Sequence, residues 1–133
     1  MAKRVNVAVG VIKSIDASGE TIYFLTKRLE EAHQGGKWEF PGGKVETDET
    51  VAQALFRELK EEVDIEILSC SPLMVVYHNY SDKEVCLNVF IVDNFQGQPA
   101  SQEGLVDGWF SLESLKELDF PEANKEIIDQ LPE

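Results

Sequence analysis

The sequence predicts an α/β protein, specifically an α/β/α sandwich in which a mixed β-sheet is flanked by helices. Segments rich in valine and isoleucine, which is typical of strands, lie on both sides of an amphipathic helical segment near the middle of the chain. These patterns interleave without the regular strand–helix–strand repeat of a doubly wound parallel sheet. A length of 133 residues suits one domain, so we expect residues 1–133 to fold as a single unit.

The first half of the chain reads as strands and loops leading to a glycine pair. Residues 5–13 and 21–26 have strand composition, and the polar segment between them predicts a turn. Residues 27–37 predict a loop, and residues 38–40 alternate briefly. The glycine pair that follows, Gly42 and Gly43, would let the backbone approach a ligand closely.

An amphipathic helix follows this glycine loop. Its apolar positions recur every four residues and are widened by two neighbours: Val51, Leu55, Leu59 and Val63, with Ala52 and Phe56 beside them. Thr50 and Gln53 fit a capping box at the start of the helix. We therefore expect one apolar face of this helix, centred on Leu59, to pack against the sheet.

The second half of the chain contains further strands and two short helices. Residues 65–69, 73–80 and 84–92 have strand composition, and residues 109–110 predict a short strand at the edge of the sheet. A helix over 112–118 would be capped by Ser111, and Pro121 suits the first turn of a final helix that reaches Leu131.

The net charge of the chain limits its partners. It has 12 Lys and Arg against 25 Asp and Glu, which gives a formal charge of −13. Such a surface repels nucleic-acid backbones and anionic membranes, so we expect neither as a partner. An anionic small substrate would need metal ions that reverse the field locally. We also expect a monomer.

The sequence shows no apolar run of transmembrane length and no signal-peptide layout at its beginning. We therefore expect a cytoplasmic protein. Its two cysteines, Cys70 and Cys86, lie among apolar residues without metal-ligand spacing. They predict two reduced thiols in or near the core.

Three glutamates gather on the central helix. Glu58, Glu61 and Glu62 stand at i, i+3 and i+4, which brings their carboxylates together on one face. Like charges at this distance raise the cost of ionising one another unless a cation lies among them. Oxygen ligands of this kind suit Mg²⁺ or Mn²⁺. The alternative is a solvated charged face, which is common in acidic helices.

The residues around these glutamates resemble the signature of the Nudix hydrolases, G-x5-E-x7-R-E-U-x-E-E-x-G-U, where U is a bulky aliphatic residue. The matching positions are Gly43, Glu49, Arg57, Glu58, Leu59, Glu61, Glu62 and Ile65. Asp64 stands where the pattern has Gly, just past the expected helix end, and Asp is among the few residues that tolerate a left-handed backbone there. The resemblance implies a Nudix-type fold.

Several flanking stretches further resemble the MutT-type branch of that family, the 8-oxo-dGTP diphosphatases: Thr26-Lys27-Arg28, Ala32-His33, residues 37–44, Gln102-Glu103-Gly104 and residues 120–124. This resemblance implies hydrolysis of 8-oxo-dGTP, and of 8-oxo-GTP, to the monophosphate and pyrophosphate. Two alternatives remain open: another Nudix substrate, such as a pyrimidine or pterin triphosphate, and a non-catalytic nucleotide sensor.

Asn124 is the candidate reader of the base. It begins the apolar helical stripe completed by Ile127, Ile128 and Leu131, so its amide should face inward. An amide oxygen facing the N7–H of 8-oxoguanine and an amide NH₂ facing O6 would fit the oxidised base and not guanine. The alternative is an amide whose hydrogen bonds are satisfied within the core.

The resemblance also implies the remaining site residues. Arg28, His33, Phe40, Gly43 and Lys44 would contact the nucleotide, although such loop residues are often merely exposed. Metal ions would be held by the Gly42 carbonyl and the carboxylates of Glu58, Glu61, Glu62 and Glu103.

Attack by water at the β phosphorus would need a base. Glu58 is the first candidate and Glu103 the second. Arg57 would orient the carboxylates, with Glu49 as its partner or as an outer metal ligand.

Overall fold

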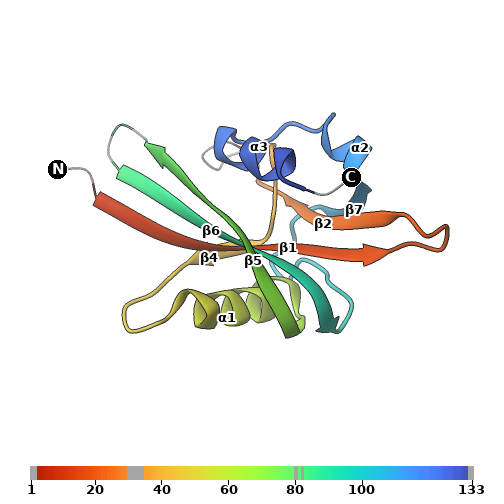
Figure 1. Cartoon of the computed structure of the whole chain (residues 1–133), viewed down its shortest axis with the longest axis horizontal. Coiled ribbons are helices and arrows are strands. Elements are labelled where there is room, and N and C mark those ends of the chain that lie inside the picture. Colours follow the sequence, from red (N-terminus) through yellow and green to blue (C-terminus); the bar gives the residue numbers. More distant parts are fainter. Residues whose placement is uncertain (1–2, 30–34, 80, 82, 132–133) are drawn as a thin grey trace.

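The computed structural model describes residues 3–29, 35–79, 81 and 83–131. Within these residues the chain forms a mixed sheet of seven strands, in which β3-β2-β1-β6-β5 lie side by side, β4 pairs with β1 and β7 pairs with β2 (Figure 1). The elements are β1 (Lys3–Ile15), β2 (Thr21–Lys27), β3 (Trp38–Glu39), β4 (Gly42–Lys44), α1 (Val51–Val63), β5 (Glu66–Asn79), β6 (Lys83–Gln96), β7 (Asp107–Ser111), α2 (Leu112–Leu115) and α3 (Glu122–Asp129).

The long strand β1 joins the two parts of the sheet. Its first ten paired residues run parallel to β6, from Lys3 opposite Lys83 to Ile12 opposite Val92. Its end, from Lys13 to Ile15, pairs antiparallel with β2. The mixed sheet expected from the sequence is therefore confirmed.

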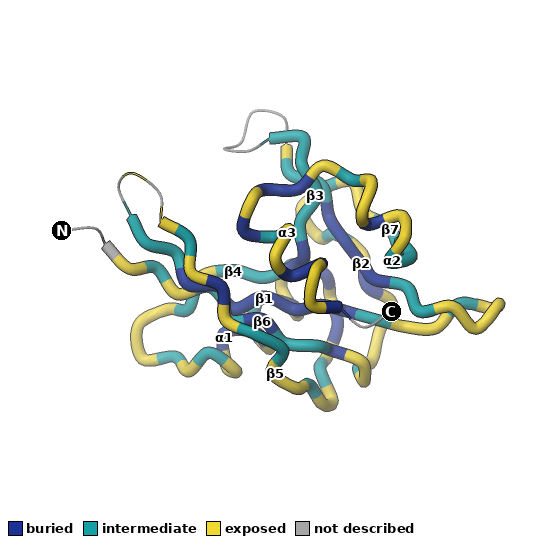
Figure 2. The backbone as a smooth tube through the Cα atoms, turned by 45° about the horizontal axis from the view of Figure 1, so that its top comes forward, coloured by how far each residue is buried: buried dark blue, intermediate teal, exposed yellow. Residues whose placement is uncertain are grey.

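Helices cover both faces of the sheet. α1 lies on one side, and α2 and α3 lie on the other (Figure 1). Side chains alternate along β1, so Val9 and Val11 pack into the core beneath α3 while Ala8 and Ile12 pack into the core beneath α1. Figure 2 shows the buried parts of the backbone concentrated where the strands meet these helices. The α/β/α arrangement matches the expectation.

The capping of α1 is as the sequence predicts. The backbone N–H of Gln53 donates to Thr50 Oγ1 at 3.1 Å, and the backbone N–H of Thr50 donates to Gln53 Oε1 at 2.8 Å. At the other end Asp64 adopts a left-handed conformation with φ 58° and ψ 45°. The carboxylate of Asp64 also accepts from Lys60 Nζ at 3.1 Å.

The helix is rotated relative to the predicted apolar face. Leu59 is fully buried, as expected, but Ala52 is exposed and 47% of Phe56 is exposed. The inward face widens on the other side, through Ala54 and the partly buried Glu58. Ala52 and Ala54 lie on opposite sides of the Leu55–Leu59 stripe, and both are apolar. The sequence therefore does not show which side of the stripe faces the sheet, and packing decides it.

Several elements differ in extent from the prediction. The two strands expected over 65–69 and 73–80 form the single strand β5, which pairs with β6 and has irregular register between Ile67 and Ser69, Ser69 and Cys70, and Pro72 and Met74. Such bulges absorb a proline, which cannot donate to the ladder. Ser111 caps α2 as predicted, but α2 ends at Leu115 and α3 at Asp129.

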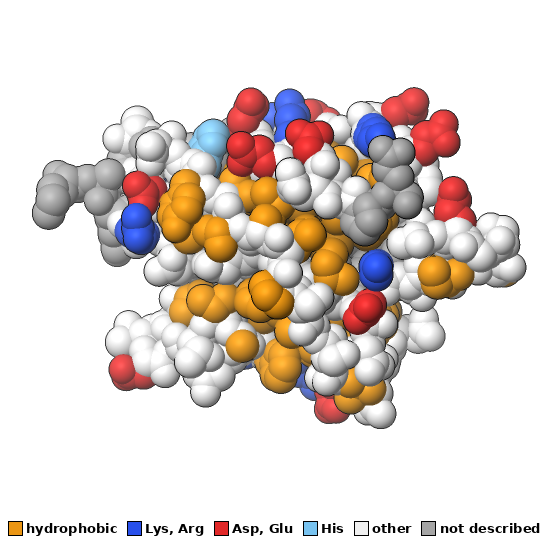
Figure 3. Space-filling view, viewed as in Figure 1, with side chains coloured by type: hydrophobic (Ala, Val, Ile, Leu, Met, Phe, Trp, Pro, Cys, Tyr) orange, Lys and Arg blue, Asp and Glu red, His pale blue; other side chains and the backbone are white. Residues whose placement is uncertain are grey.

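The surface agrees with the acidic composition. Acidic side chains gather along the edge over α2 and α3 at the top of Figure 3, and hydrophobic side chains are visible across the middle of this face. None of the helices in the part of the chain that the structure describes is long and apolar enough to cross a membrane.

Candidate functional site

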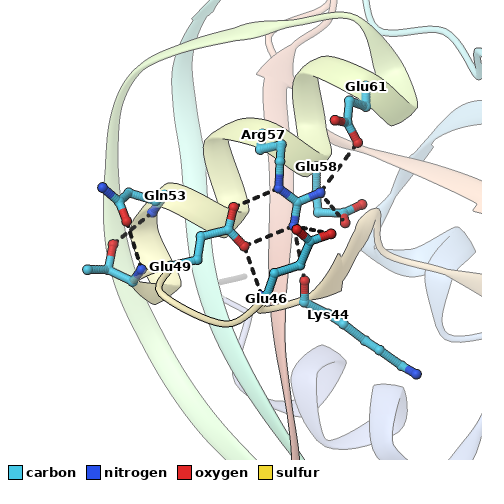
Figure 4. Close-up of polar contacts among 8 residues, drawn as sticks. Lys44, Glu46, Glu49, Gln53, Arg57, Glu58 and Glu61 are labelled. Carbon is cyan, nitrogen blue, oxygen red and sulfur yellow. Dashed lines mark hydrogen bonds and ion pairs between the residues drawn. The ribbon is translucent and has the colours of Figure 1, made fainter.

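Arg57 on α1 is the centre of one group of carboxylates. It binds Glu49 through two nitrogens, with Nε 2.6 Å from Oε2 and an Nη atom 2.9 Å from Oε1. A second Nη atom donates to Glu58 at 2.8 Å and to Glu61 at 3.4 Å (Figure 4). Arg57 also donates to the Lys44 carbonyl at 3.2 Å, which ties α1 to the loop before it.

This network has clear electrostatic effects. Hydrogen bonds from Arg57 and from the Glu46 backbone lower the pKa of Glu49 to about 2, and the same carboxylates raise the pKa of Arg57. A bidentate arginine–carboxylate pair fixes both partners geometrically. Arg57 therefore holds the Glu58 side chain in place, as the sequence interpretation proposed.

A second group of carboxylates lies on the sheet side of α1. The pKa of Glu62 is raised to about 8, first by burial and then by the charges of Glu39, Glu103 and Glu58, while a backbone hydrogen bond from Gly42 lowers it slightly. Among the described residues no salt bridge reaches Glu62. Close, partly buried carboxylates of this kind favour a cation between them.

Backbone hydrogen bonds bring Glu103 to this group. The loop between β6 and β7 is attached to the end of α1 because the Gln102 N–H donates to the Glu62 carbonyl at 2.8 Å and the Ala100 N–H donates to the Val63 carbonyl at 3.1 Å. The Ser101 hydroxyl then accepts from the backbone N–H of Glu103 at 3.3 Å. Because Gln102 is hydrogen-bonded to the Glu62 backbone, the next residue, Glu103, is held close to Glu62.

The two glycines serve different contacts. A Cβ on Gly42 would overlap the carbonyl of Ala8, so close packing of β4 on β1 requires glycine there. A Cβ on Gly43 would overlap the carboxylate of Glu58. Gly43 therefore gives room to the Glu58 side chain, and its expected contact with the nucleotide stays a prediction.

The chemistry of this cluster suits a hard divalent cation. The donors are all oxygens, from Glu58, Glu62 and Glu103 with Glu61 nearby on the helix, and buried like charges gain from a cation among them. In the described residues, however, no three His, Cys, Asp or Glu side chains are arranged so that they could hold a metal ion. Glu58 is turned to Arg57, and 63% of the Glu61 side chain is exposed. Binding a cation here therefore requires side-chain rotation.

A cavity of about 220 Å³ lies near the cluster. Its floor is the sheet, and its walls come from β3, β4 and the start of α3, with these lining residues: Val5, Val7, Val9, Arg28, Glu39, Phe40, Gly42, Lys44, Lys83, Val85, Leu87, Pro121, Ala123 and Asn124. The Phe40 ring stacks on Phe120 with centroids 5.9 Å apart, which fixes the wall. A mostly apolar slot with few polar groups suits a flat aromatic base.

Asn124 lies in the first turn of α3 and lines this cavity. It was expected to face inward on an apolar stripe, but it is only partly buried, whereas Ala123 and Ile127 are buried. Within the described part of the chain its amide makes no hydrogen bond, and a partly buried, unbonded amide does not match the alternative of a core amide with satisfied hydrogen bonds. The amide is available to a ligand.

The structure brings together most of the residues expected at the site. Arg28, Phe40, Gly42 and Lys44 line the cavity, and the Lys44 ammonium group extends away from Arg57 (Figure 4). His33 lies outside the described residues. Glu61, expected among the inner ligands, points outward next to Arg57.

The sequence interpretation missed Glu39. This residue pairs with Arg28 at 2.7 Å and affects the pKa of Glu62. Its signal was the short alternation Trp38-Glu39-Phe40, which puts a charge on the face opposite two aromatic rings, directly before the glycine pair.

Comparison with known proteins identifies similar chains. The family model of the NUDIX domain matches residues 8–130. The 8-oxo-dGTP diphosphatase of Escherichia coli strain K12 is 37% identical over 129 residues, which is 97% of each chain. The CTP pyrophosphohydrolase of the same organism is 36% identical over 103 residues, 77% of this chain and 75% of that one. A solved structure from a study of MutT of Aliivibrio salmonicida and Vibrio cholerae has 34% identity and a TM-score of 0.80, covering 96% of each chain.

Proposed function

The chain belongs to the Nudix family, and from this membership we propose that it is a nucleoside triphosphate pyrophosphohydrolase that cleaves 8-oxo-dGTP and 8-oxo-GTP. The products would be the nucleoside monophosphate and pyrophosphate. Removal of oxidised guanine nucleotides in this way prevents their mutagenic incorporation. The relatives named 8-oxo-dGTP diphosphatase support this substrate class.

The observation that carries the proposal is the free amide of Asn124 in an apolar cavity close to buried carboxylates. Its Oδ1 would accept from the N7–H of 8-oxoguanine, and its Nδ2 would donate to O6. Guanine presents a lone pair at N7, so the amide oxygen would face another acceptor. A buried polar pairing of this kind can discriminate strongly between two otherwise similar bases.

The carboxylate cluster would carry the chemistry. Glu58, Glu61, Glu62, Glu103 and the Gly42 carbonyl would hold Mg²⁺, or Mn²⁺ in its place. A divalent cation there would supply neutralisation of the phosphate charge and a lower pKa for a bound water. Glu58 would take the proton from the water that attacks the β phosphorus, with Glu103 as the second candidate. Arg57 would keep Glu58 oriented, while Glu49 holds Arg57.

The cavity contacts would place the nucleotide against this cluster. Arg28 and Lys44 would meet the phosphates and Phe40 would contact the base. His33, outside the described residues, is proposed as a further contact of the nucleotide. We further propose a single domain that works as a monomer on free nucleotides in the cytoplasm. The net charge of −13 supports the exclusion of nucleic-acid polymers.

A pyrimidine triphosphate is the second candidate substrate, favoured by the similarity to a CTP pyrophosphohydrolase. A pyrimidine triphosphate would bind at the same carboxylate cluster, but it has no N7–H and O6 edge for the Asn124 amide to pair with. A pure nucleotide sensor fits less well, because binding alone does not require Arg57 to orient Glu58.

The test is pyrophosphate release from 8-oxo-dGTP, 8-oxo-GTP, dGTP, CTP and a pterin triphosphate, each with Mg²⁺, with Mn²⁺ and with EDTA. We expect hydrolysis of the oxidised guanine nucleotides at low substrate concentration, much slower hydrolysis of dGTP, and no activity in EDTA. Faster hydrolysis of CTP or of the pterin triphosphate would overturn the proposed substrate class. Absence of turnover with every nucleotide would overturn the proposal that the protein is an enzyme.

A further inference from the structure

The loop between β6 and β7 carries Glu103 and is attached to the rest of the protein at two places. Near its start the backbone N–H groups of Ala100 and Gln102 donate to carbonyls at the end of α1, at 3.1 and 2.8 Å. Near its end the Val106 carbonyl accepts from the backbone N–H of the last residue of β2 at 2.8 Å. Glu103 lies between these attachments and is exposed. An exposed loop residue keeps one position only if further bonds hold its backbone.

Ser101 supplies such bonds. Its hydroxyl accepts from the backbone N–H of Glu103 at 3.3 Å and from that of Leu105 at 3.0 Å. One oxygen therefore joins the residues on both sides of the loop tip. Serine and threonine hydroxyls form local bonds of this kind, and a side chain without a hydroxyl cannot replace them.

Asp107 in turn holds Ser101. Its carboxylate accepts from the backbone N–H of Ser101 at 2.7 Å. Asp107 is the first residue of β7 and pairs with Thr26 of β2 in the antiparallel ladder. A charged acceptor makes such a bond shorter and stronger than a neutral one. The two side chains, which we call the Ser101–Asp107 brace, thus connect the loop tip to a residue whose backbone the sheet fixes.

The braced residue Glu103 faces the carboxylate cluster. Its charge raises the pKa of Glu62 and of Glu39, so its side chain lies near both. The neighbouring N–H of Gln102 is bonded to the Glu62 carbonyl at 2.8 Å. The backbone position of Glu103 therefore decides how closely its carboxylate approaches a cation that it shares with Glu62.

We propose that Ser101 and Asp107 are positioning residues whose hydrogen bonds hold the Glu103 carboxylate at the cluster before a cation binds. This inference rests on the proposed function, which assigns Glu103 to the cation site. Neither Ser101 nor Asp107 touches the cation or the nucleotide. A loop that is ordered in advance loses less conformational entropy on binding, so the brace raises the affinity for the cation.

The charge of Asp107 offers a competing explanation, since one more carboxylate near the loop attracts Mg²⁺ without ordering anything. Asp107→Asn separates the two effects, because an amide oxygen still accepts from the Ser101 N–H after the charge is lost. Asp107→Ala removes both the acceptor and the charge. Ser101→Thr and Ser101→Ala make the corresponding comparison for the hydroxyl.

Two measurements on the full chain test the proposal. Hydrogen exchange of the Glu103 and Leu105 backbone amides, followed by NMR in the metal-free protein, reports whether the loop is ordered. Calorimetric titration of Mg²⁺ alone reports whether that order helps cation binding. The double variant Ser101→Ala with Glu103→Gln shows whether Ser101 acts through Glu103.

Asp16→Ala is the matched control. The Asp16 carboxylate also accepts from backbone N–H groups in an exposed turn, those of Ser18 at 2.9 Å and Glu20 at 3.0 Å. This turn joins β1 to β2 and lies at the far tip of their hairpin (Figure 1). The control therefore removes the same charge and the same kind of loop bond at a distance from the cluster.

We expect Ser101→Ala and Asp107→Ala to raise both exchange rates about tenfold and to weaken Mg²⁺ binding about fivefold, the scale of one lost hydrogen bond. Ser101→Thr and Asp107→Asn should retain most of the order and of the affinity. In the Glu103→Gln background Ser101→Ala should still raise the exchange rates but should not weaken Mg²⁺ further. Asp16→Ala should match the wild type in both measurements.

An Mg²⁺ affinity of Ser101→Ala equal to that of the wild type would overturn the proposal, whatever the exchange rates. So would an Asp107→Asn variant as weak as Asp107→Ala, which would assign the effect to charge, or a full further loss in the Glu103→Gln background. A wild type that hydrolyses no nucleotide overturns the proposed function alone, because both measurements are made without substrate.

Discussion

Two groups of carboxylates flank α1, and they differ in what neutralises them. On the outer side Glu49 is matched by Arg57 at 2.6 Å, and its pKa falls to about 2. On the sheet side no salt bridge reaches Glu62 among the residues that the structure describes, and burial together with the like charges of Glu39, Glu103 and Glu58 raises its pKa to about 8. Glu49 and Glu62 come from one short stretch of sequence, so the different pKa values of these two glutamates are decided by their neighbours.

The difference separates support from function. In the group around Arg57 the guanidinium pairs with Glu49 and Glu58, and its bonds to Glu49 and to the Lys44 carbonyl fix the loop and the helix relative to each other. The group around Glu62 is incomplete without a cation, and that incompleteness is what a phosphate-cleaving site requires. Glu58 lies between them, since it is bonded to Arg57 and acts on Glu62.

Replacing Glu58 should have the largest effect on catalysis. Glu58→Gln keeps the shape of the side chain and removes its charge, so kcat should fall by at least ~10² with the fold intact. Glu66→Gln, an exposed change just beyond α1, is the control. Near-normal turnover of the Glu58 variant in pyrophosphate release would show that the base lies elsewhere, with Glu103 next in line.

The orientation of α1 decides which glutamates face the sheet, and two apolar side chains on the helix test it. Leu59 is fully buried, so Leu59→Ala should lower the free energy of unfolding by roughly 2 to 5 kcal/mol. Phe56 is 47% exposed, so Phe56→Ala should cost much less. Urea denaturation of both variants gives the comparison, and equal losses would mean that the helix is rotated differently in solution.

Selectivity should depend on Asn124. Removing its two hydrogen bonds to the oxidised base, with the ligand groups left unpaired, should weaken 8-oxo-dGMP binding by some 2 to 4 kcal/mol. Binding of dGMP should change little, so the two affinities converge in Asn124→Ala. Lys125→Ala on the exposed side of α3 is the control. A preference for the oxidised base that survives in Asn124→Ala, measured by calorimetry, would place base recognition elsewhere.

The outer group should give a smaller, pH-dependent effect on stability. Because the pKa of Glu49 is lower in the folded protein than its ordinary value of 4.5, its stabilisation is present above pH 4.5 and is lost as the pH falls toward 2. Glu49→Gln should remove the part of the loss of folding stability at low pH that comes from protonation of Glu49. Melting temperatures of both proteins between pH 6 and pH 3 provide the measurement, and parallel curves would contradict the role given to Arg57.

Local features of the fold could be predicted from the sequence. The capping box of Thr50 and Gln53 and the left-handed Asp64 depend on neighbouring residues, and both are confirmed. The order of the longer strands and of the helices followed from apolar periodicity, whereas β4 (Gly42–Lys44) lies where the sequence predicted a glycine loop.

Long-range packing decided what the sequence could not show. The rotation of α1 depends on which flank meets the sheet, and the continuous β5 depends on bulges against β6. The neighbours of Glu39 depend on the folded sheet in the same way, because Arg28 and Glu62 lie close to it only after folding; the sequence showed only a charge between two aromatic residues.

Metal binding tests most directly the claim that Arg57 already holds the outer carboxylates, whereas the carboxylates around Glu62 await a cation. Mg²⁺ is titrated by calorimetry into the wild type, Glu62→Gln and Glu49→Gln. The two variants are matched because each removes one carboxylate. We predict a loss of affinity of about tenfold or more in Glu62→Gln, and affinity close to that of the wild type in Glu49→Gln. Equal losses in both variants, or none in Glu62→Gln, would contradict the distinction between the two groups.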